Sequence, residues 1–376
     1  MREPRGSRRA RARPQQAVSG SGTASSRFEA AASGAGAAGA ELGDAAETAR
    51  GAAVSSPGIV TEPAAGAEVS PPDAPKSPIR HAAETGVSSF GAIVQFLACP
   101  ECAAPITERD RCLRCPHGHS FDIAKQGYVS LLTGASTKMT GDSADMLNAR
   151  AAFQGSGHFS PIAEAIAHAV AGGAAETAAG GAAESSGGPA VLELGSGTGY
   201  YLAAVLDALA ESHGIALDVS KYAARRAARA HPRAASVLAD AWRGLPVRDA
   251  ALSHVLSVFA PRNPAEVARV LAPGGTFVVV TPTARHLGEL IGPLGMITVD
   301  GGKDTRLADT LSTRFVPLDR TPVEYPMSLG HTDIANVAAM GPSAHHAAAD
   351  RAERLAALPE RLDVTASVTV ARYGLR

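Results

Sequence analysis

A glycine-rich stretch near the middle of the chain has the residue types and spacing that ligand binding requires. The apolar stretch 191–194 ends at Gly195, and Gly197 and Gly199 follow at alternate positions. Glycine has no Cβ, so such a turn bends sharply and brings its backbone against a ligand. An apolar helical pattern follows over 202–209. Together these features predict a strand, a tight turn and a helix, with a nucleotide-like cofactor at the turn.

Two carboxylates beside this turn indicate which cofactor it binds. Asp218 lies near the end of a second predicted strand, 214–219, about 20 residues beyond Gly195, where an acid can accept both ribose hydroxyls. Glu193 precedes the glycines, and a carboxylate there repels a pyrophosphate but can hold an ammonium. S-adenosylmethionine carries an ammonium and a sulfonium and no phosphate, so we predict that cofactor. A glycine turn that binds nothing is the alternative, against which the acid-ended second strand counts.

A second group of reactive residues is a set of cysteines and histidines near residue 100. The four cysteines of the chain are Cys99, Cys102, Cys112 and Cys115. This clustering favours a metal site in a reducing compartment over a disulfide framework. Two tight turns separated by a hairpin can present four ligands to one point, which predicts one structural zinc ion. An all-cysteine site fits the spacing, as does one in which His119 replaces Cys112, and His117 is a third contender.

These residues need a scaffold, and the hydrophobic pattern predicts an α/β fold. Strands are expected at 191–194, 214–219, 235–239, 252–259 and 276–281, with helices between them. The order is that of the class I S-adenosylmethionine-dependent methyltransferases, with Asp240 and Ala241 where adenine contacts lie. Two late stretches, 323–329 and 364–371, are expected as the antiparallel pair that ends a Rossmann-like, mostly parallel, seven-stranded sheet.

Composition limits how much of the chain can pack. Of 376 residues, 39 are glycine and 25 proline, and the stretch 1–89 has almost no large apolar side chains, so we expect it to be a disordered tail. The formal net charge of −1 does not indicate a polyanion partner, so binding to RNA would require a local basic face on the protein. No stretch has the length of a membrane span and none resembles a signal peptide, which favours a cytoplasmic protein without membrane contact.

Several separate motifs together resemble one family. They are the cysteine-rich segment, FDIAKQGYVSLL (121–132), GDSADMLNAR (141–150), GHFSP (157–161), VLELGSGTGYY (191–201) and TPTARHL (281–287). From about Cys99 to the C-terminus the chain resembles the 23S rRNA guanine-N1 methyltransferases. VFAPRNPAE (258–266) and VAAMGPS (337–343) are more similar to the actinobacterial branch linked to resistance against tylosin-type macrolides. The tail before Phe90 and an insertion at 171–188 depart from the family pattern and touch no motif.

The resemblance implies roles for individual residues. The family's metal pattern, C-x2-C-x12-C-x3-H, falls on Cys99, Cys102, Cys115 and His119 and leaves Cys112 outside. With the fold-based assignments, the implied cofactor residues are Phe159, Glu193, Gly195, Gly197, Tyr200, Tyr201, Asp218, Asp240, Ala241 and His286. No general base is identified: His286 suits that role geometrically, but the resemblance makes it a cofactor contact first. Phe259 is a candidate for stacking on the target base, with plain packing as the alternative.

The expected organisation has five parts. A disordered tail covers 1–89, a zinc-binding module 94–134, a helical connector 135–170, a low-complexity linker 171–188, and a methyltransferase domain 189–376. Cations of the module and the segment after it are expected to dock RNA phosphates: Arg109, Arg111, Arg114, His117, Lys125 and Lys138. Stabilising the fold alone is the alternative role for the module.

The resemblance implies methylation of guanine N1 in a hairpin loop of 23S rRNA, with S-adenosylmethionine and one structural zinc ion, by a homodimer. Two other classes of protein remain. One is a small-molecule methyltransferase stabilised by a zinc module, and the other is a zinc-bearing RNA-binding protein without activity. An intact cofactor motif counts against the inactive protein; its residues are Glu193, Gly195, Gly197 and Asp218. The zinc module counts against the small-molecule enzyme.

Overall fold

The computed structural model describes residues 89–134, 137, 139–179, 188–298, 303–341 and 350–376. The expected disordered tail lies outside the described residues except for Ser89, as do residues 180–187 of the expected linker. Among the described residues, no helix combines the length and apolar character that crossing a membrane requires.

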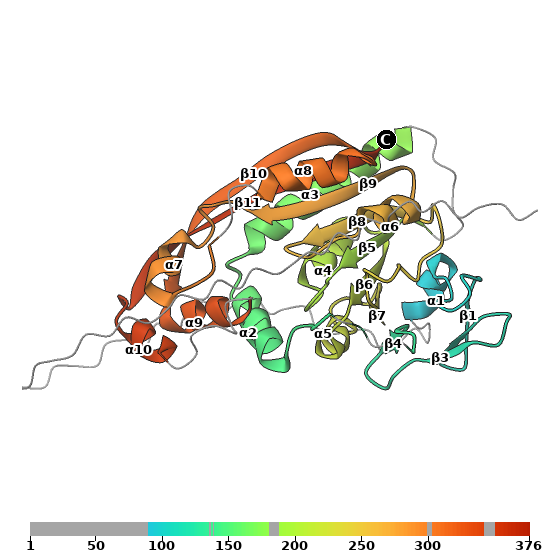
Figure 1. Ribbon diagram of the computed structural model, residues 1–376, viewed down its shortest axis with the longest axis horizontal. Helices are drawn as coiled ribbons and strands as arrows, with labels where there is room; N and C mark the ends of the chain where they lie inside the picture. Colours follow the sequence, from blue (N-terminus) through green and yellow to red (C-terminus); the bar gives the residue numbers. More distant parts are fainter. Residues whose placement is uncertain (1–88, 135–136, 138, 180–187, 299–302, 342–349) are drawn as a thin grey trace, which may run out of the picture. The chain divides into compact units, whose positions relative to one another are not determined.

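An eight-stranded sheet forms the centre of the fold, in the order β10-β11-β9-β8-β5-β6-β7-β4 (Figure 1). Its middle consists of β5 (Ala190–Leu194), β6 (His213–Asp218), β7 (Ala234–Leu238), β8 (Leu252–Val258) and β9 (Leu271–Pro282). These five strands pair in parallel. Every residue of β5 and β7 is buried, as expected of parallel strands covered on both faces, and the class I methyltransferase order is confirmed.

The edge of the sheet formed by the C-terminal strands is antiparallel. The strands β10 (Phe315–Gly330) and β11 (Arg361–Leu375) pair along almost their whole length, and β11 also runs antiparallel to β9. Both strands are longer than the predicted stretches 323–329 and 364–371, because their exposed outer positions carry polar residues that hide the apolar pattern. The strand β11 thus brings Thr365 and Ser367 to the end of β9.

Helices connect the strands and cover the sheet. They are α4 (Tyr200–Ala208), α5 (Lys221–Ala227), α6 (Pro264–Val270), α7 (Gly288–Leu294), α8 (Lys303–Ser312), α9 (His331–Ala339) and α10 (Arg351–Ala356). Side-chain caps set where two of them begin: Ser220 accepts from the Ala223 N–H at the start of α5, and Asn263 accepts from the Glu266 N–H at the start of α6. The sequence patterns predict α4 and helices between the parallel strands, but not α8, α9 or α10.

The connector before the sheet is helical, as its pattern predicts. It consists of α2 (Ala144–Gly155), capped by Ser143, and α3 (Ser160–Ala179). The expected boundary at 170 is wrong, because α3 continues through the first part of the predicted linker. Alanine dominates that stretch and is the strongest helix former, so low complexity did not prevent a helix there.

The zinc module is built onto the edge of the sheet. It contains α1 (Ser89–Ile93), the 3-10 turn Val94–Phe96, and an antiparallel sheet of β1 (Thr107–Arg109), β2 (Cys112–Arg114) and β3 (Ser120–Asp122). Its last strand, β4 (Tyr128–Ser130), pairs in parallel with β7, so the central sheet has eight strands where the sequence predicted seven. Buried side chains of the module and of the sheet form one continuous core.

Candidate functional site

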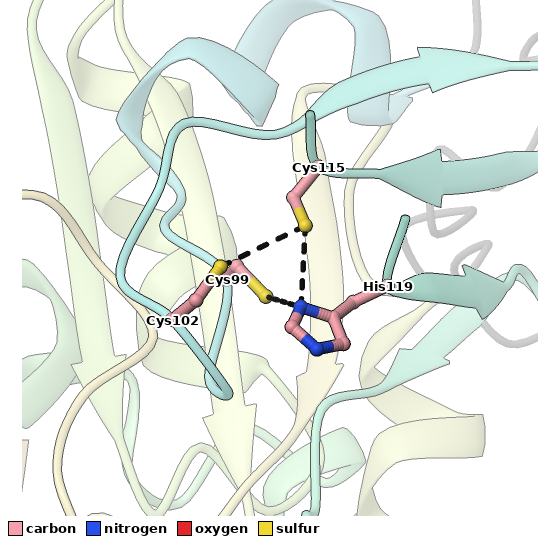
Figure 2. Close-up of side chains that lie close together, drawn as sticks. All are labelled: Cys99, Cys102, Cys115 and His119. Atoms are coloured by element: carbon pink, nitrogen blue, oxygen red, sulfur yellow. Dashed lines mark hydrogen bonds between the residues drawn. The ribbon is translucent and has the colours of Figure 1, made fainter. Parts of the chain in front are cut away.

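Four predicted metal ligands meet at one point between two turns of the zinc module (Figure 2). The ligand atoms of Cys99, Cys102, Cys115 and His119 all lie within 4.8 Å of one another. The Nδ1 of His119 is 3.3 Å from the Cys115 Sγ and 3.5 Å from the Cys99 Sγ, and the Cys102 and Cys115 sulfurs are 3.7 Å apart. Tetrahedral zinc with bonds of about 2.3 Å to sulfur and about 2.0 Å to nitrogen needs edges of this size. The donor set therefore fits a closed structural zinc site.

Cys112 and His117 lie outside this cluster. The Cys112 Sγ is buried on β2, 3.3 Å from the Ser120 Oγ, so the all-cysteine alternative is not the arrangement of the structure. The Nδ1 of His117 is 3.2 Å from the Cys102 Sγ, where its N–H can donate to a metal-bound thiolate. Such a bond stabilises the charge on a ligand without joining the metal.

The thiols of the cluster differ in acidity. Burial raises the pKa of Cys99 to about 11. Desolvation also acts on Cys115, but hydrogen bonds with the backbone of His119 and His117 and with the side chains of Cys102 and His119 together lower its pKa to about 6. Metal binding would favour the ionised form of each thiol.

The predicted cofactor residues gather around a cavity of about 610 Å³ at the carboxyl ends of the parallel strands. Eight of the ten line it: Phe159, Glu193, Gly195, Tyr201, Asp218, Asp240, Ala241 and His286. Gly197 and Tyr200 are not among the lining residues. Tyr200 instead packs edge-on against Tyr201, with ring centroids 5.1 Å apart.

Glu193 is the most deeply buried carboxylate of the cavity wall, with 1% of its surface exposed. Its Oε2 accepts a hydrogen bond from the Leu202 N–H at the start of α4, at 3.2 Å. Burial raises its pKa to about 8, so the carboxyl group holds a proton at neutral pH in the absence of a cation. An ammonium beside it would favour the ionised form.

Asp218 shapes the glycine loop as well as facing the cavity. Its Oδ2 accepts from the Gly197 N–H at 2.9 Å, and its Oδ1 accepts from the Ser220 N–H at 2.8 Å. Burial raises the pKa of this carboxyl group, and those two N–H bonds oppose the rise. Each oxygen keeps a lone pair that can accept from a ribose hydroxyl.

The glycine loop is tightly enclosed. Gly195 has φ +64°, and a Cβ there would lie 2.8 Å from the Ala260 Cβ. Gly197 has φ +53°, and a Cβ there would lie 2.7 Å from the Arg150 Nη1. These two glycines are needed both for the left-handed backbone and for the close approach of Ala260 and Arg150.

Arg150 is a cavity residue whose role the sequence did not reveal, although its segment carried the family resemblance. Its guanidinium bonds the Asp142 Oδ2 and the Met340 carbonyl, each at 2.6 Å, and so joins α2 to the end of α9. Gln154, one turn later, accepts from the Thr198 hydroxyl at 2.6 Å. Helical spacing put both side chains on one face of α2, but nothing in the sequence showed that this face meets the glycine loop.

Asp240 and Ala241 follow β7 and also line the cavity. The two carboxylate oxygens of Asp240 accept from the Trp242 N–H at 3.0 Å and from the Thr137 hydroxyl at 2.6 Å. Trp242, the single tryptophan of the chain, stands half exposed at the cavity, which the sequence did not indicate.

Aromatic rings form the wall where the substrate would enter. Phe259 directly follows β8 with φ +53° and exposes 41% of its surface, and its ring stacks on His286 with centroids 5.7 Å apart. Phe159 is buried behind them, 5.9 Å from His286 and 6.5 Å from Phe259. A left-handed backbone is rare for a bulky side chain, and here it directs the ring into the cavity. This placement favours the base-stacking role for Phe259 over plain packing.

The cavity fits S-adenosylmethionine better than a dinucleotide. The charged groups near the glycine loop include the carboxyl groups of Glu193 and Asp218 and the guanidinium of Arg150, which also pairs with Asp142. Together they match an ammonium, a ribose and a carboxylate. A pyrophosphate would face two acids at this position.

Comparisons with known proteins agree with this geometry. A family model described as "RlmA, N-terminal", a zinc ribbon, matches residues 97–136, and one described as "Methyltransferase domain" matches residues 191–275. The chain is 47% identical over 278 residues to a 23S rRNA (guanine(748)-N(1))-methyltransferase of Streptomyces fradiae, which covers 74% of this chain and 96% of the relative.

Two further relatives carry similar names. A putative 23S rRNA (guanine-N(1)-)-methyltransferase of Micromonospora griseorubida is 46% identical over 291 residues, 75% of this chain and 98% of the relative. One of Bacillus subtilis is 32% identical over 181 residues, 46% of this chain and 58% of the relative. Since the similarity to the Streptomyces and Micromonospora proteins extends over nearly their whole length, this chain belongs to the family of 23S rRNA (guanine-N1)-methyltransferases.

Proposed function

We propose that this chain transfers a methyl group from S-adenosylmethionine to N1 of a guanine in a hairpin loop of 23S rRNA. The exposed Phe259 ring at the mouth of a carboxylate-lined cavity is the observation that carries the proposal. The guanine would correspond to position 748 in the name of the Streptomyces relative.

The residues of the cavity would bind, orient and desolvate the reactants. We assign the cofactor's ammonium to Glu193, its ribose to Asp218 and its carboxylate to Arg150. When bound, S-adenosylmethionine supplies a methyl group made electrophilic by the sulfonium. Phe259 would hold the base flat and the buried rings of Phe159 and Tyr201 would exclude water, so most of the rate enhancement would come from alignment.

The substrate must offer an unstacked guanine, and a hairpin loop does so at lower cost than a helix. We assign phosphate docking to exposed cations of the zinc module, chiefly Arg114 and Lys125. Arg111 is removed from the expected docking set, because its Nη2 donates to the Ala124 and Ile123 carbonyls at 3.1 and 3.4 Å and so supports the module's own fold. Lys138 lies outside the described residues.

Three wider aspects of the function also remain proposals. Family resemblance suggests a homodimer, which light scattering of the purified protein would test. The branch resemblance suggests a contribution to resistance against tylosin-type macrolides, which drug sensitivity of a deletion strain would test. A ribosomal substrate suggests a cytoplasmic location, which fractionation would test.

Primer extension tests the activity itself. Methylation at N1 blocks Watson–Crick pairing, so reverse transcriptase should stop one nucleotide before the modified guanine in wild-type 23S rRNA and read through in a deletion strain. The purified protein with S-adenosylmethionine should restore the stop on unmodified rRNA. If rRNA is unchanged in the deletion strain, the small-molecule methyltransferase becomes the better reading. Cofactor binding without any transfer would favour the inactive RNA-binding protein.

A further inference from the structure

His286 has a fixed tautomer, because a backbone group occupies one of its ring nitrogens. The Nδ1 accepts a hydrogen bond from the Ser367 N–H at 3.1 Å. A nitrogen that accepts such a bond has no proton, so in the neutral ring the proton lies on Nε2. Burial lowers the pKa of His286 to about 4, which keeps the ring neutral at physiological pH. The imidazole is therefore a hydrogen-bond donor at Nε2 and is not a general base there.

The segment that carries His286 is held to β11 on both sides of the ring. The Thr283 N–H donates to the Ser367 carbonyl at 3.0 Å, and the Leu287 N–H donates to the Thr365 carbonyl at 2.8 Å. Thr365 in turn donates its N–H and its hydroxyl to Glu289, at 3.0 and 2.6 Å. These bonds hold the segment in place, and a flip of the ring that exchanged its two nitrogens would break the bond from the Ser367 N–H.

The Nε2 of His286 is available to a ligand of the cavity. His286 lines the cavity, and no hydrogen bond from its Nε2 occurs in the part of the chain that the structure describes. Its ring stacks on Phe259 at 26° with centroids 5.7 Å apart, an offset stack that leaves part of the Phe259 face uncovered. A base resting on that uncovered part would lie beside the imidazole and nearly in its plane, as an in-plane N–H···O bond requires.

We propose that the Nε2–H of His286 donates a hydrogen bond to O6 of the target guanine, which makes His286 a catalytic and specificity-determining residue. This inference rests on the proposed function. Guanine presents an acceptor at O6, whereas adenine presents an amino donor there, so the fixed N–H selects guanine.

The same bond would act during the reaction. As the N1 proton leaves to a water of the cavity, negative charge spreads over N1 and O6, and the Nε2–H stabilises the charge on O6. The N1 lone pair then forms the bond to the methyl carbon while the carbon–sulfur bond breaks and its electron pair stays on sulfur. The products are N1-methylguanine, a neutral thioether and a protonated water.

Two variants separate the donor from the ring. His286→Phe keeps a flat ring beside Phe259 and removes the donor, whereas His286→Gln keeps an N–H donor and an acceptor for the Ser367 N–H. Single-turnover methylation of a hairpin transcript should slow by roughly 10²- to 10³-fold in His286→Phe and recover most of that loss in His286→Gln. The melting temperature and the affinity for S-adenosylhomocysteine, measured in parallel, should change little.

Replacing the acceptor atom makes the test independent of folding. Transcripts carrying guanosine, inosine or 6-thioguanosine at the target position are compared with the wild type and with His286→Phe. The penalty of the variant should be equal for guanosine and inosine, which share O6, and at least tenfold smaller for 6-thioguanosine, whose sulfur is a weak acceptor. An equal penalty on all three, or a loss of S-adenosylhomocysteine affinity as large as the loss of rate, would overturn the inference and make His286 a cofactor contact. A wild-type protein that methylates none of them would overturn the proposed function itself.

Discussion

The zinc module and the central sheet are stabilised by different means. Strands β1, β2 and β3 have three residues each, and although buried side chains of the module join the core of the sheet, three thiols and an imidazole of the module also converge on one point. Strands β5 to β9 are largely buried and bring apolar side chains together on both faces. A small segment needs a metal because its surface is large for its volume, and the sheet does not.

The polar groups of the two regions differ in the same way. In the module they point inward at the metal position and leave no open coordination site, so the zinc contributes stability and no chemistry. In the sheet they sit at the carboxyl ends of strands, where Glu193 and Asp218 face a cavity and resist burial. The polar groups available for the reaction are therefore ones whose burial destabilises the fold. The polar groups of the module stabilise it, because all of them would bind the metal.

The two regions meet at β7, which pairs with β4 of the module. A cleft of about 830 Å³ lies between them, and Asp240, which follows β7, lines both this cleft and the cofactor cavity. Loss of the metal should therefore change the structure around Asp240, at one wall of the cavity, but not that of the glycine loop.

Metal removal should have the largest effect. Cys115→Ser should lose its zinc and leave the module unfolded, since structural zinc contributes on the order of 10 kcal/mol. Metal analysis should find no zinc in the variant. Hydrogen exchange should show rapid exchange of the amides of residues 97–130, while the amides of β5 and β6 stay protected. Cys112→Ser, the matched control, should keep one zinc per chain. Loss of zinc from this variant would support the all-cysteine ligand set instead. Equal protection of the module without zinc would end the contrast between the two regions.

Glu193→Gln should show that the catalytic end of the sheet is held at a cost to stability. The pKa of Glu193 is about 8 in the folded state and 4.5 in the unfolded state, so the side chain keeps its proton on folding. Its contribution to the free energy of unfolding is therefore complete below pH 4.5 and is lost as the pH rises to 8. The variant should match the wild type at pH 4.5 in denaturant unfolding and exceed it by up to about 5 kcal/mol at pH 8. S-adenosylhomocysteine should nevertheless bind the wild type more tightly. Parallel stability curves for the two proteins would contradict the assignment.

Asp218→Ala should weaken S-adenosylhomocysteine binding by on the order of 3 kcal/mol, because two charge-assisted hydrogen bonds to the ribose are lost. Calorimetry measures the affinity, and thermal melting shows how much of the change comes from losing the bonds to Gly197 and Ser220. Asp207→Ala removes an exposed acid of α4 and serves as the control. Unchanged affinity in Asp218→Ala would remove the ribose role.

Charge reversal on the module should have the smallest effect and should spare the cofactor site. Arg114→Glu and Lys125→Glu should each raise the KM for a hairpin transcript roughly fivefold at 0.1 M salt, about 1 kcal/mol, and flatten its salt dependence. Arg314→Glu changes an exposed cation next to β10, the opposite edge strand of the sheet, and should leave the KM unchanged. If all three variants behave alike, the module has no docking role and serves only stability.

Much of this protein follows from local sequence. The glycine spacing, the acids at 193 and 218 and the parallel strands depend on short-range patterns, so the cofactor and fold class were predicted directly. The ligand set with His119 needed family resemblance, because the spacing alone fits an all-cysteine site equally well. The structure excludes that alternative geometrically by turning Cys112 away from the cluster toward Ser120.

Contacts between distant segments were decided only by the tertiary structure. Sequence patterns could not place β4 beside β7, Arg150 against Gly197, or the Ser367 N–H on His286, 81 residues away. Each of these depends on which faces meet once the sheet has formed, and no periodicity within one element records its neighbour. The sequence thus determined which groups are available for chemistry, while packing determined their protonation, their orientation and the surfaces that they share.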